Sequence, residues 1–335
     1  MLARGVLVCL AASVLSGGCV REYQQKVAVD HYVEGQLLAE QGRYHAALDE
    51  LAEAVRADPT LAVAHTAAGD VHRRRGSYEL ARRSYQKACD ANPYAFRPHY
   101  NLGVTYQALA TQGGDLDEEL LRQAVIVYLR AVEIQPEDFG TNLNLSACYF
   151  QIGKYKLAET YCMAAIEARP DSAQAYSNLG AIYDSQNRLY DAIRAYKTSL
   201  ELDTHQPHLL MNLAATYTRQ GRWGAALRTY QSAAELLPGS SQAWTQAGRC
   251  LYHLGRYDEA LDAYRRALET DASNAAAHRG LGAVRMTQYV QDRRRTELRD
   301  AALAAWHRSL EIDPRQEDLR RLVKRYAPRR TTPQL

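Results

Sequence analysis

Phenylalanine and proline are scarce in this sequence. Its 335 residues hold 3 Phe and 10 Pro, against 23 Tyr. So few prolines, together with 47% hydrophobic and 24% charged residues, exclude a disordered or fibrous chain and favour an ordered one. The net charge of +3 is small for this length, and basic residues are interleaved with acidic ones, so no nucleic acid is expected as a partner.

Catalytic signatures are missing as well. The sequence has no Walker loop, no GxSxG nucleophile motif, no HExxH zinc motif and no dinucleotide-binding fingerprint. His205 and His208 have a spacing that can bind metal, but no third ligand lies near them in the sequence. We therefore expect no catalytic residues, no metal site and no cofactor, which means that the protein is not an enzyme.

What the sequence does contain is a unit of 34 residues that recurs along most of the chain. In the copy that starts at Ser241, apolar residues follow helical spacing on both sides of Gly255, which predicts two antiparallel helices joined by a short turn. The small residues Gly248 and Ala260 are expected where the two helices approach most closely. One such hairpin cannot bury its apolar faces, so the copies must stack on one another.

Eight copies share this register. The position of Ala260 is alanine in all of them, and six end with a proline, which stops the second helix. Two copies carry insertions, of nine residues between Gly103 and Ala124 and of eight residues between Gly282 and Ala302, which predict loops or longer helices. The copies cover residues 28–61, 62–95, 96–138, 139–172, 173–206, 207–240, 241–274 and 275–316.

The pattern resembles the tetratricopeptide repeat (TPR) over residues 28–316. The resemblance implies an all-α fold, a right-handed superhelical TPR solenoid of eight helix-turn-helix repeats. Beyond it, apolar residues on one face predict a capping helix over residues 317–326. Residues 327–335 are expected to be a disordered tail.

Residues 1–18 are typical of a signal peptide, because Arg4 is followed by an apolar core too short to span a bilayer. The run up to Cys19 resembles the lipobox of bacterial lipoproteins in a relaxed form, since Leu15 lies one residue farther from the cysteine than usual. This resemblance implies lipidation of Cys19, with residues 19–27 as a linker, and the absence of an acidic residue at Val20 favours the outer membrane, facing the periplasm. An ordinary secretory signal and a spurious hydrophobic start are the alternatives.

Four cysteines lie in the repeats: Cys89, Cys148, Cys162 and Cys250. Cys148 and Cys162 belong to one hairpin and could form a disulfide in an oxidising compartment. The favoured alternative is that they are buried thiols acting as small hydrophobic residues. His31, His65, His99 and His278 share the position of Trp244, so we interpret them as packing residues.

Binding residues are expected on the first helices of the repeats. Two positions after that of Trp244, successive copies carry Asn101, Asn144, Asn178, Asn212 and Gln246. The resemblance to TPR proteins implies that such amides hold the backbone of an extended peptide, each offering a donor and an acceptor. The alternative is that asparagine is merely tolerated there. Arginines on or near the same surface would favour carboxylate groups: Arg73, Arg97 and Arg249.

Together these features predict a non-enzymatic scaffold or adaptor in the bacterial cell envelope. It would bind a protein or extended peptide in a concave groove and the membrane through its lipid anchor, as pilotin-like TPR lipoproteins do, which it resembles. The alternative is a regulatory or substrate-recruiting subunit of an envelope enzyme such as a glycosyltransferase or a peptidoglycan hydrolase. An enzyme that co-purifies at a fixed ratio would favour that alternative.

Overall fold

The computed structural model describes the backbone of residues 2–327 and the side chains of residues 20–327. Within this range the chain forms 17 α-helices and no strand. It divides into two compact units, Met1–Pro170 and Asp171–Leu335, which are described separately below. The predicted all-α architecture of stacked helix hairpins is confirmed.

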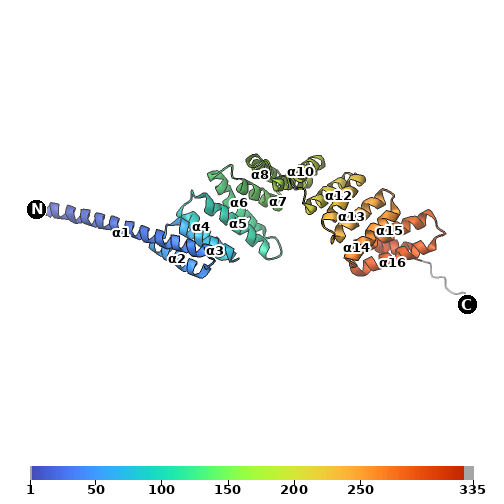
Figure 1. Cartoon of the computed structure of the whole chain (residues 1–335), viewed down its shortest axis with the longest axis horizontal. Helices are drawn as coiled ribbons and strands as arrows, with labels where there is room; N and C mark the ends of the chain where they lie inside the picture. Colours follow the sequence, from blue (N-terminus) through green and yellow to red (C-terminus); the bar gives the residue numbers. More distant parts are fainter. Residues whose placement is uncertain (1, 328–335) are drawn as a thin grey trace. The chain divides into compact units, whose positions relative to one another are not determined.

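Unit 1 consists of four helix pairs in which each helix packs against the next one in the chain (Figure 1). The pairs follow one another in sequence order, and the second helix of each packs on the first helix of the next within the unit. Its helices are α1 (Leu2–Glu40), α2 (Tyr44–Ala57), α3 (Ala62–Arg74), α4 (Tyr78–Ala91), α5 (Phe96–Gln112), α6 (Glu118–Ile134), α7 (Phe139–Gln151) and α8 (Tyr155–Ala168).

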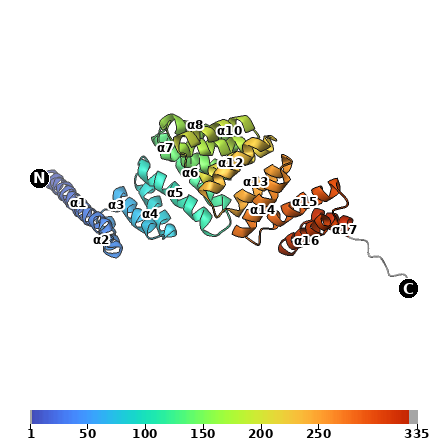
Figure 2. The same cartoon turned by 45° about the vertical axis from the view of Figure 1, so that its right-hand side comes forward.

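Unit 2 contains four further pairs and a last helix that packs on α16 (Figure 2). This last helix buries Leu319 and Val323 against Met286 and Trp306, so it covers the apolar end of the final pair, as expected of a capping helix. The helices are α9 (Ala173–Ser185), α10 (Leu189–Leu202), α11 (Pro207–Arg219), α12 (Trp223–Leu236), α13 (Ser241–His253), α14 (Tyr257–Thr270), α15 (Ala275–Gln291), α16 (Thr296–Ile312) and α17 (Glu317–Tyr326).

The predicted repeat boundaries coincide with helix starts. Seven of the predicted copies begin at the first residue of a helix, from Ala62 of α3 to Ala275 of α15. The helix pairs are therefore consistent with eight repeats. The insertions lengthen helices rather than only the loops, since α5, α6, α15 and α16 each have 17 residues where α3 has 13 and α4 has 14.

The turn inside most hairpins needs one residue with a left-handed backbone conformation. Glycine fills this position in five hairpins, with φ between 71° and 75°, and Asn187 fills it in a sixth with φ 60°. Glycine and asparagine are the residues that adopt this conformation at low cost, which is why they end the first helices here.

Within a hairpin, the glycine on the first helix is packed against an aromatic ring of the second. A Cβ atom added to Gly248 would lie 2.8 Å from the ring of Tyr264, and one added to Gly180 would lie 2.4 Å from that of Tyr196. An aromatic ring of the second helix therefore lies in front of Gly248. In the fourth hairpin the residues equivalent to Gly248 and Ala260 are in contact, since Ser146 Oγ donates to the carbonyl of Ala158 at 2.8 Å. Ala260 is itself fully buried.

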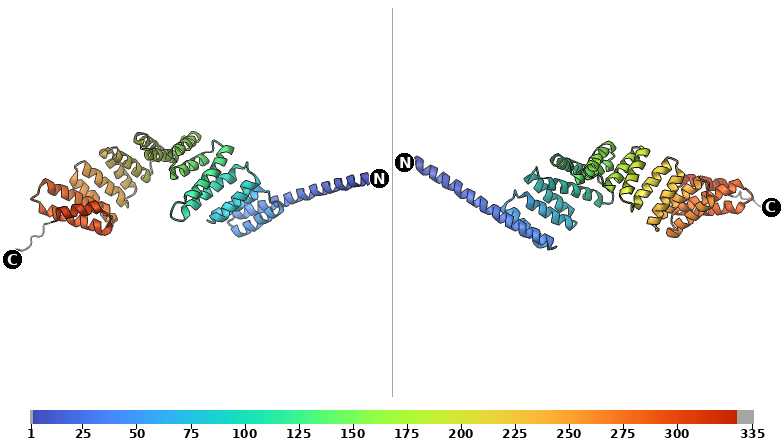
Figure 3. Two further views of the ribbon diagram at one scale, coloured as in Figure 1. Left: turned by 180° about the vertical axis from the view of Figure 1, so that it is seen from behind. Right: turned by 45° about the horizontal axis from the view of Figure 1, so that its top comes forward.

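Helix α1 begins long before the first predicted repeat. The sequence predicts a linker for residues 20–27, but α1 runs through them without a break. The N-terminal part of α1 extends beyond the C-terminal end of α2 (Figure 3). The segment from Val20 to Val27 contains no Gly or Pro, so nothing in it stops a helix. The side chain of Cys19 and the residues beyond 327 lie outside the described part of the chain, so the lipid site and the disordered tail stay predictions. Among the described residues, no helix is both long and apolar enough to cross a membrane.

Candidate functional site

The first helices of unit 2 share an exposed face. In α11 this face is formed by His208, Asn212, Ala215 and Arg219, all exposed and spaced so that they lie on one side of the helix. The equivalent residues of α9 and α13 are exposed or half-buried. We call these three helix surfaces the first-helix face of unit 2.

Three of the predicted amide residues lie on this face. Asn212 is exposed, and Asn178 and Gln246 are half-buried. Within the described part of the chain, no hydrogen bond joins any of these three side-chain amides to another residue. Their donors and acceptors are therefore available to a ligand.

The two predicted asparagines of unit 1 are in a different situation. Asn101 is buried, and its Nδ2 donates to Asp70 Oδ1 at 2.9 Å. The half-buried Asn144 makes a side-chain hydrogen bond with Tyr128. Both amides have internal partners, so in unit 1 these residues stabilise the packing of neighbouring helices.

Asp70 is the centre of this arrangement, and the sequence analysis missed it. Its carboxylate accepts from Tyr85 Oη at 2.6 Å, from Arg97 Nη2 at 2.6 Å and from Asn101, which ties α3 to α4 and α5. Arg73 Nε in turn donates to Tyr85 Oη at 3.3 Å. Burial, and then the hydrogen bond to Asp70, raise the pKa of Tyr85 far above its usual value.

The predicted cations Arg73 and Arg97 are thus both joined to this network, which limits their use for a ligand. A cavity of about 220 Å³ opens beside it, with Asp70 and Arg97 on one side and Tyr32 of α1 among its other lining residues. A signal for Asp70 does exist in the sequence. It precedes Arg97 by 27 residues and Asn101 by 31, which is close to one repeat, so an acid on one first helix can meet partners on the next.

Unit 2 has a related contact between first helices. Arg219 of α11 forms an ion pair with Asp184 of α9, and its Nη2 also donates to Asn187 Oδ1 at 2.9 Å. Thr216 Oγ1 donates to the same aspartate at 2.9 Å. These contacts fix α9 against α11 beside Asn178 and Asn212.

Arg249 is the predicted cation that remains available. It is exposed on α13, and among the described residues it forms no ion pair. The next residue on that face is His253, and the ring of Trp223 of α12 stacks on it with ring centroids 3.8 Å apart. Desolvation and the charge of Arg249 lower the pKa of His253, so this ring favours its neutral form. Arg249 therefore supplies positive charge next to the amide of Gln246.

The cysteines and histidines have structural roles. Cys148 and Cys162 are buried thiols that are not joined in a disulfide, and burial raises the pKa of each thiol to about 12. His65, His99 and His278 each contact the carbonyl oxygen six residues earlier, at 3.1–3.2 Å, which fits their interpretation as packing residues. In the described part of the chain, no three His, Cys, Asp or Glu side chains are grouped to hold a metal ion.

Comparisons with known proteins agree with the helical repeats. A family model described as the cilia and flagella-associated protein 70 C-terminal domain matches residues 30–281. A comparison with curated proteins found no match.

Solved structures give the same fold at low identity. YrrB, a TPR protein with an unusual peptide-binding site, has a TM-score of 0.50 and 24% identity, covering 59% of this chain and 97% of that one. PilF of Pseudomonas aeruginosa has a TM-score of 0.52 and 18% identity, covering 66% and 96%. A TPR protein of Parabacteroides merdae has a TM-score of 0.52 and 16% identity, covering 79% and 98%.

At identities of 16–24%, the similarity to these solved structures shows a shared fold and nothing about function. The family match spans more than half of the chain and nearly all of its helix pairs. The chain is a tetratricopeptide-repeat protein and belongs to the family described as the cilia and flagella-associated protein 70 C-terminal domain.

Proposed function

We propose that this protein is a non-enzymatic scaffold that binds an extended peptide segment of a partner protein along the first-helix face of unit 2. The observation that carries the proposal is the recurrence of Asn178, Asn212 and Gln246 at the repeat period, with amides that have no internal partner among the described residues. The TPR fold supports a role in protein interaction, and the structurally similar YrrB is a TPR protein with a peptide-binding site.

The spacing of the amides suits an extended chain. Helices α9 and α11 are in contact, and packed helices have axes about 8–10 Å apart. An extended chain advances about 3.3–3.6 Å per residue, so successive amides would meet it at about every second or third residue. Each amide can pair with both the N–H and the C=O of one residue of an extended chain, because these two groups point to the same side of the strand. Because Arg249 is an unpaired cation on this face, a segment with a carboxylate near Gln246 would bind best.

The cellular setting belongs to the same proposal. Lipidation at Cys19 would hold the protein on the outer membrane of a bacterial envelope, facing the periplasm. This part is supported by the sequence of residues 1–19. PilF shares the fold at 18% identity, which supports no finer likeness to pilotins.

The test begins with a photo-crosslinking amino acid in place of Asn212, used in cells to capture and identify the partner. Binding of that partner is then measured for a triple variant, Asn178→Ala, Asn212→Ala and Gln246→Ala. Each hydrogen bond contributes about 0.5–1.5 kcal/mol net, so the triple variant should bind about 1.5–4.5 kcal/mol more weakly if the contributions add. Alanine favours the helix more than asparagine does, so circular dichroism should be unchanged.

The matched control changes three exposed cations on second helices: Lys87→Ala, Lys156→Ala and Arg265→Ala. It should bind the partner as the wild type does. If the first-helix triple keeps full affinity while the control loses it, the partner binds elsewhere and the proposal is wrong.

A further inference from the structure

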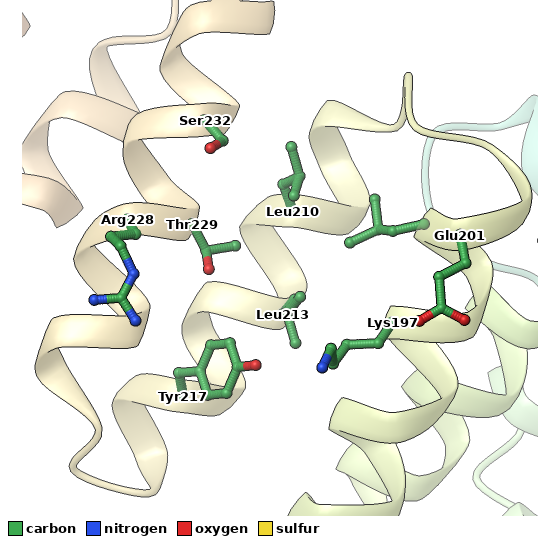
Figure 4. Close-up of a pocket in the computed structure, with 9 residues that line it drawn as sticks. Lys197, Glu201, Leu210, Leu213, Tyr217, Arg228, Thr229 and Ser232 are labelled. Atoms are coloured by element: carbon green, nitrogen blue, oxygen red, sulfur yellow. The ribbon is translucent and has the colours of Figure 1, made fainter.

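Unit 2 has a second candidate surface on the other side of α11. A cavity of about 350 Å³ opens between α10 and α12, and its floor is formed by Leu210, Leu213 and Tyr217 of α11 (Figure 4). These residues are spaced to lie away from Asn212, which belongs to the first-helix face. We call this cavity the outer pocket.

The next repeat has a smaller pocket at the same place. It lies between α12 and α14 and has a volume of about 200 Å³. Seven of its eight lining residues follow residues of the outer pocket by one repeat of 34 residues, and the eighth is Glu259. Trp244 stands there in place of Leu210, and Arg266 stands in place of Ser232. The guanidinium carbon of Arg266 lies 4.8 Å from the ring centroid of Trp244, so an indole covered by a cation occupies this position.

The outer pocket lacks both of these groups. Leucine and serine are smaller than tryptophan and arginine and leave the place of the indole open, while the floor residues Leu213 and Tyr217 are larger than their counterparts Ala247 and Leu251. Tyr217 is 9% exposed and Leu213 4%, so the floor is apolar and well packed. The repeat itself therefore shows what shape of side chain the outer pocket accepts, namely an aromatic ring lying on the apolar floor between two second helices.

The rims of the two pockets carry opposite charge. Lys197 of α10 and Arg228 of α12 flank the outer pocket with Glu201, and neither cation is in an ion pair among the described residues (Figure 4). At the positions of Lys197 and Arg228, the smaller pocket has Gln231 and Asp262. The rim of the outer pocket is therefore positive, and it would attract carboxylates next to the inserted ring.

We propose that the outer pocket is a docking site for an aromatic side chain on an acidic segment of a partner protein. The ring would lie over Leu213 and Tyr217 in the place that Trp244 takes in the next repeat. Lys197 and Arg228 would bind the neighbouring carboxylates and cover the ring face. This site is separate from the first-helix face, so it can bind while that face is empty.

The experiment uses the full-length protein and a fluorescein-labelled peptide in which one tryptophan is flanked by aspartates and glutamates, with binding followed by fluorescence anisotropy. Two matched peptides replace the tryptophan by alanine, or the acidic residues by lysines. The wild-type protein should bind the first peptide, and each change to the peptide should weaken binding by about tenfold or more.

Two protein variants copy the neighbouring pocket. Leu210→Trp with Ser232→Arg should fill the outer pocket, and Lys197→Gln with Arg228→Asp should remove its positive charge. Each should weaken binding of the acidic tryptophan peptide by about tenfold or more. The charge variant alters exposed residues only, so it tests the proposal even if the filled variant fails to fold.

Lys156→Ala, at an exposed cation of unit 1, serves as the control and should leave this peptide's affinity unchanged, and Asn212→Ala tests whether the peptide binds the first-helix face instead. Absence of binding to the wild type, equal binding of the alanine peptide, or full affinity of the charge variant would each overturn the proposal. A loss of affinity in Asn212→Ala equal to that in the charge variant would also overturn it, because the peptide would then occupy the first-helix face.

Discussion

Two residues of α7 and α8 compensate each other in volume. In four hairpins a glycine of the first helix faces a tyrosine of the second, as Gly69 does with Tyr85, where an added Cβ would lie 2.6 Å from the ring. At the corresponding places the fourth hairpin has Ser146 and Cys162, both buried. Ser146 Oγ donates to the carbonyl of Ala158 at 2.8 Å, which shows how closely the two helices approach.

We therefore predict that Cys162→Tyr alone destabilises the protein by about 1–3 kcal/mol, because the ring would overlap Ser146. Adding Ser146→Gly should restore most of this loss, since it recreates the pair found in the other hairpins. Chemical denaturation of the two single variants and the double variant measures the coupling. Simple addition of the two single effects would contradict the compensation.

This pair also shows how far residue-scale prediction reaches. The repeat register places Cys162 at the position that is usually tyrosine, and the structure agrees that it is a buried thiol. The register does not say which residue fills the vacated space, because that depends on three-dimensional packing across the hairpin. The same limit applies to Asp70, whose partners Tyr85, Arg97 and Asn101 lie on two other helices.

At the scale of elements, the Asp70 network joins three consecutive helices. Its carboxylate is largely buried, with 16% of the side chain exposed, and it accepts from three donors. Asp70→Asn removes the charge and one acceptor oxygen, so we predict a loss of about 1–3 kcal/mol in the free energy of unfolding. Asp262→Asn is the control, because its ion pair with Arg265 is exposed and should contribute less than about 1 kcal/mol. Equal effects of the two substitutions on urea denaturation would show that the network contributes no more to the free energy of unfolding than an exposed ion pair does.

The tyrosines packed between helices also predict a pH dependence. Burial raises the pKa of Tyr85, Tyr196 and Tyr264 above their usual value near 10. In the unfolded chain these groups lose their protons near pH 10, while the folded protein keeps them, so the unfolded state binds fewer protons above that pH. Their contribution to stability is complete below pH 10 and decreases as the pH rises further.

In an alkaline titration, the tyrosinate absorbance of these buried rings should therefore appear together with the loss of helicity, because the rings ionise only when the helices separate. Ionisation of the buried tyrosines well before the loss of helicity would contradict this prediction.

Helix positions could be predicted well from the sequence, and helix lengths less well. Starts such as Ala173 and Ser241 follow from the repeat because each lies at a break in helical periodicity. The insertions were expected as loops or longer helices, and the structure adds residues to both helices of each pair. Periodicity cannot decide this, since extra turns on both helices keep the contacts of the hairpin unchanged.

For the whole molecule, the N-terminal end of α1 determines how close a lipid at Cys19 would hold the repeats to a membrane. Residues 20–27 are helical, and eight helical residues span about 12 Å, whereas the same residues fully extended would reach about 26–29 Å. An acyl chain at Cys19 would thus hold the first helix pair within a short, defined distance of the bilayer. The exposed side chains of Val20 and Tyr23, at 56% and 70%, would then lie next to the lipid headgroups.

The anchor is tested with Cys19→Ala, produced in a Gram-negative bacterium that is supplied with labelled palmitate. The wild type should incorporate the label and sediment with membranes. Cys19→Ala should do neither or remain as an unprocessed precursor, because the acyl chain is attached to this sulfur and cleavage follows the attachment. Cys9→Ala is the matched control, since it alters a cysteine of the predicted signal peptide and should leave the label in place. A wild type without label, or a Cys19→Ala variant that keeps it, would contradict the lipid anchor, and mass spectrometry of the mature N-terminus would then distinguish an ordinary secretory signal from a start that is never cleaved.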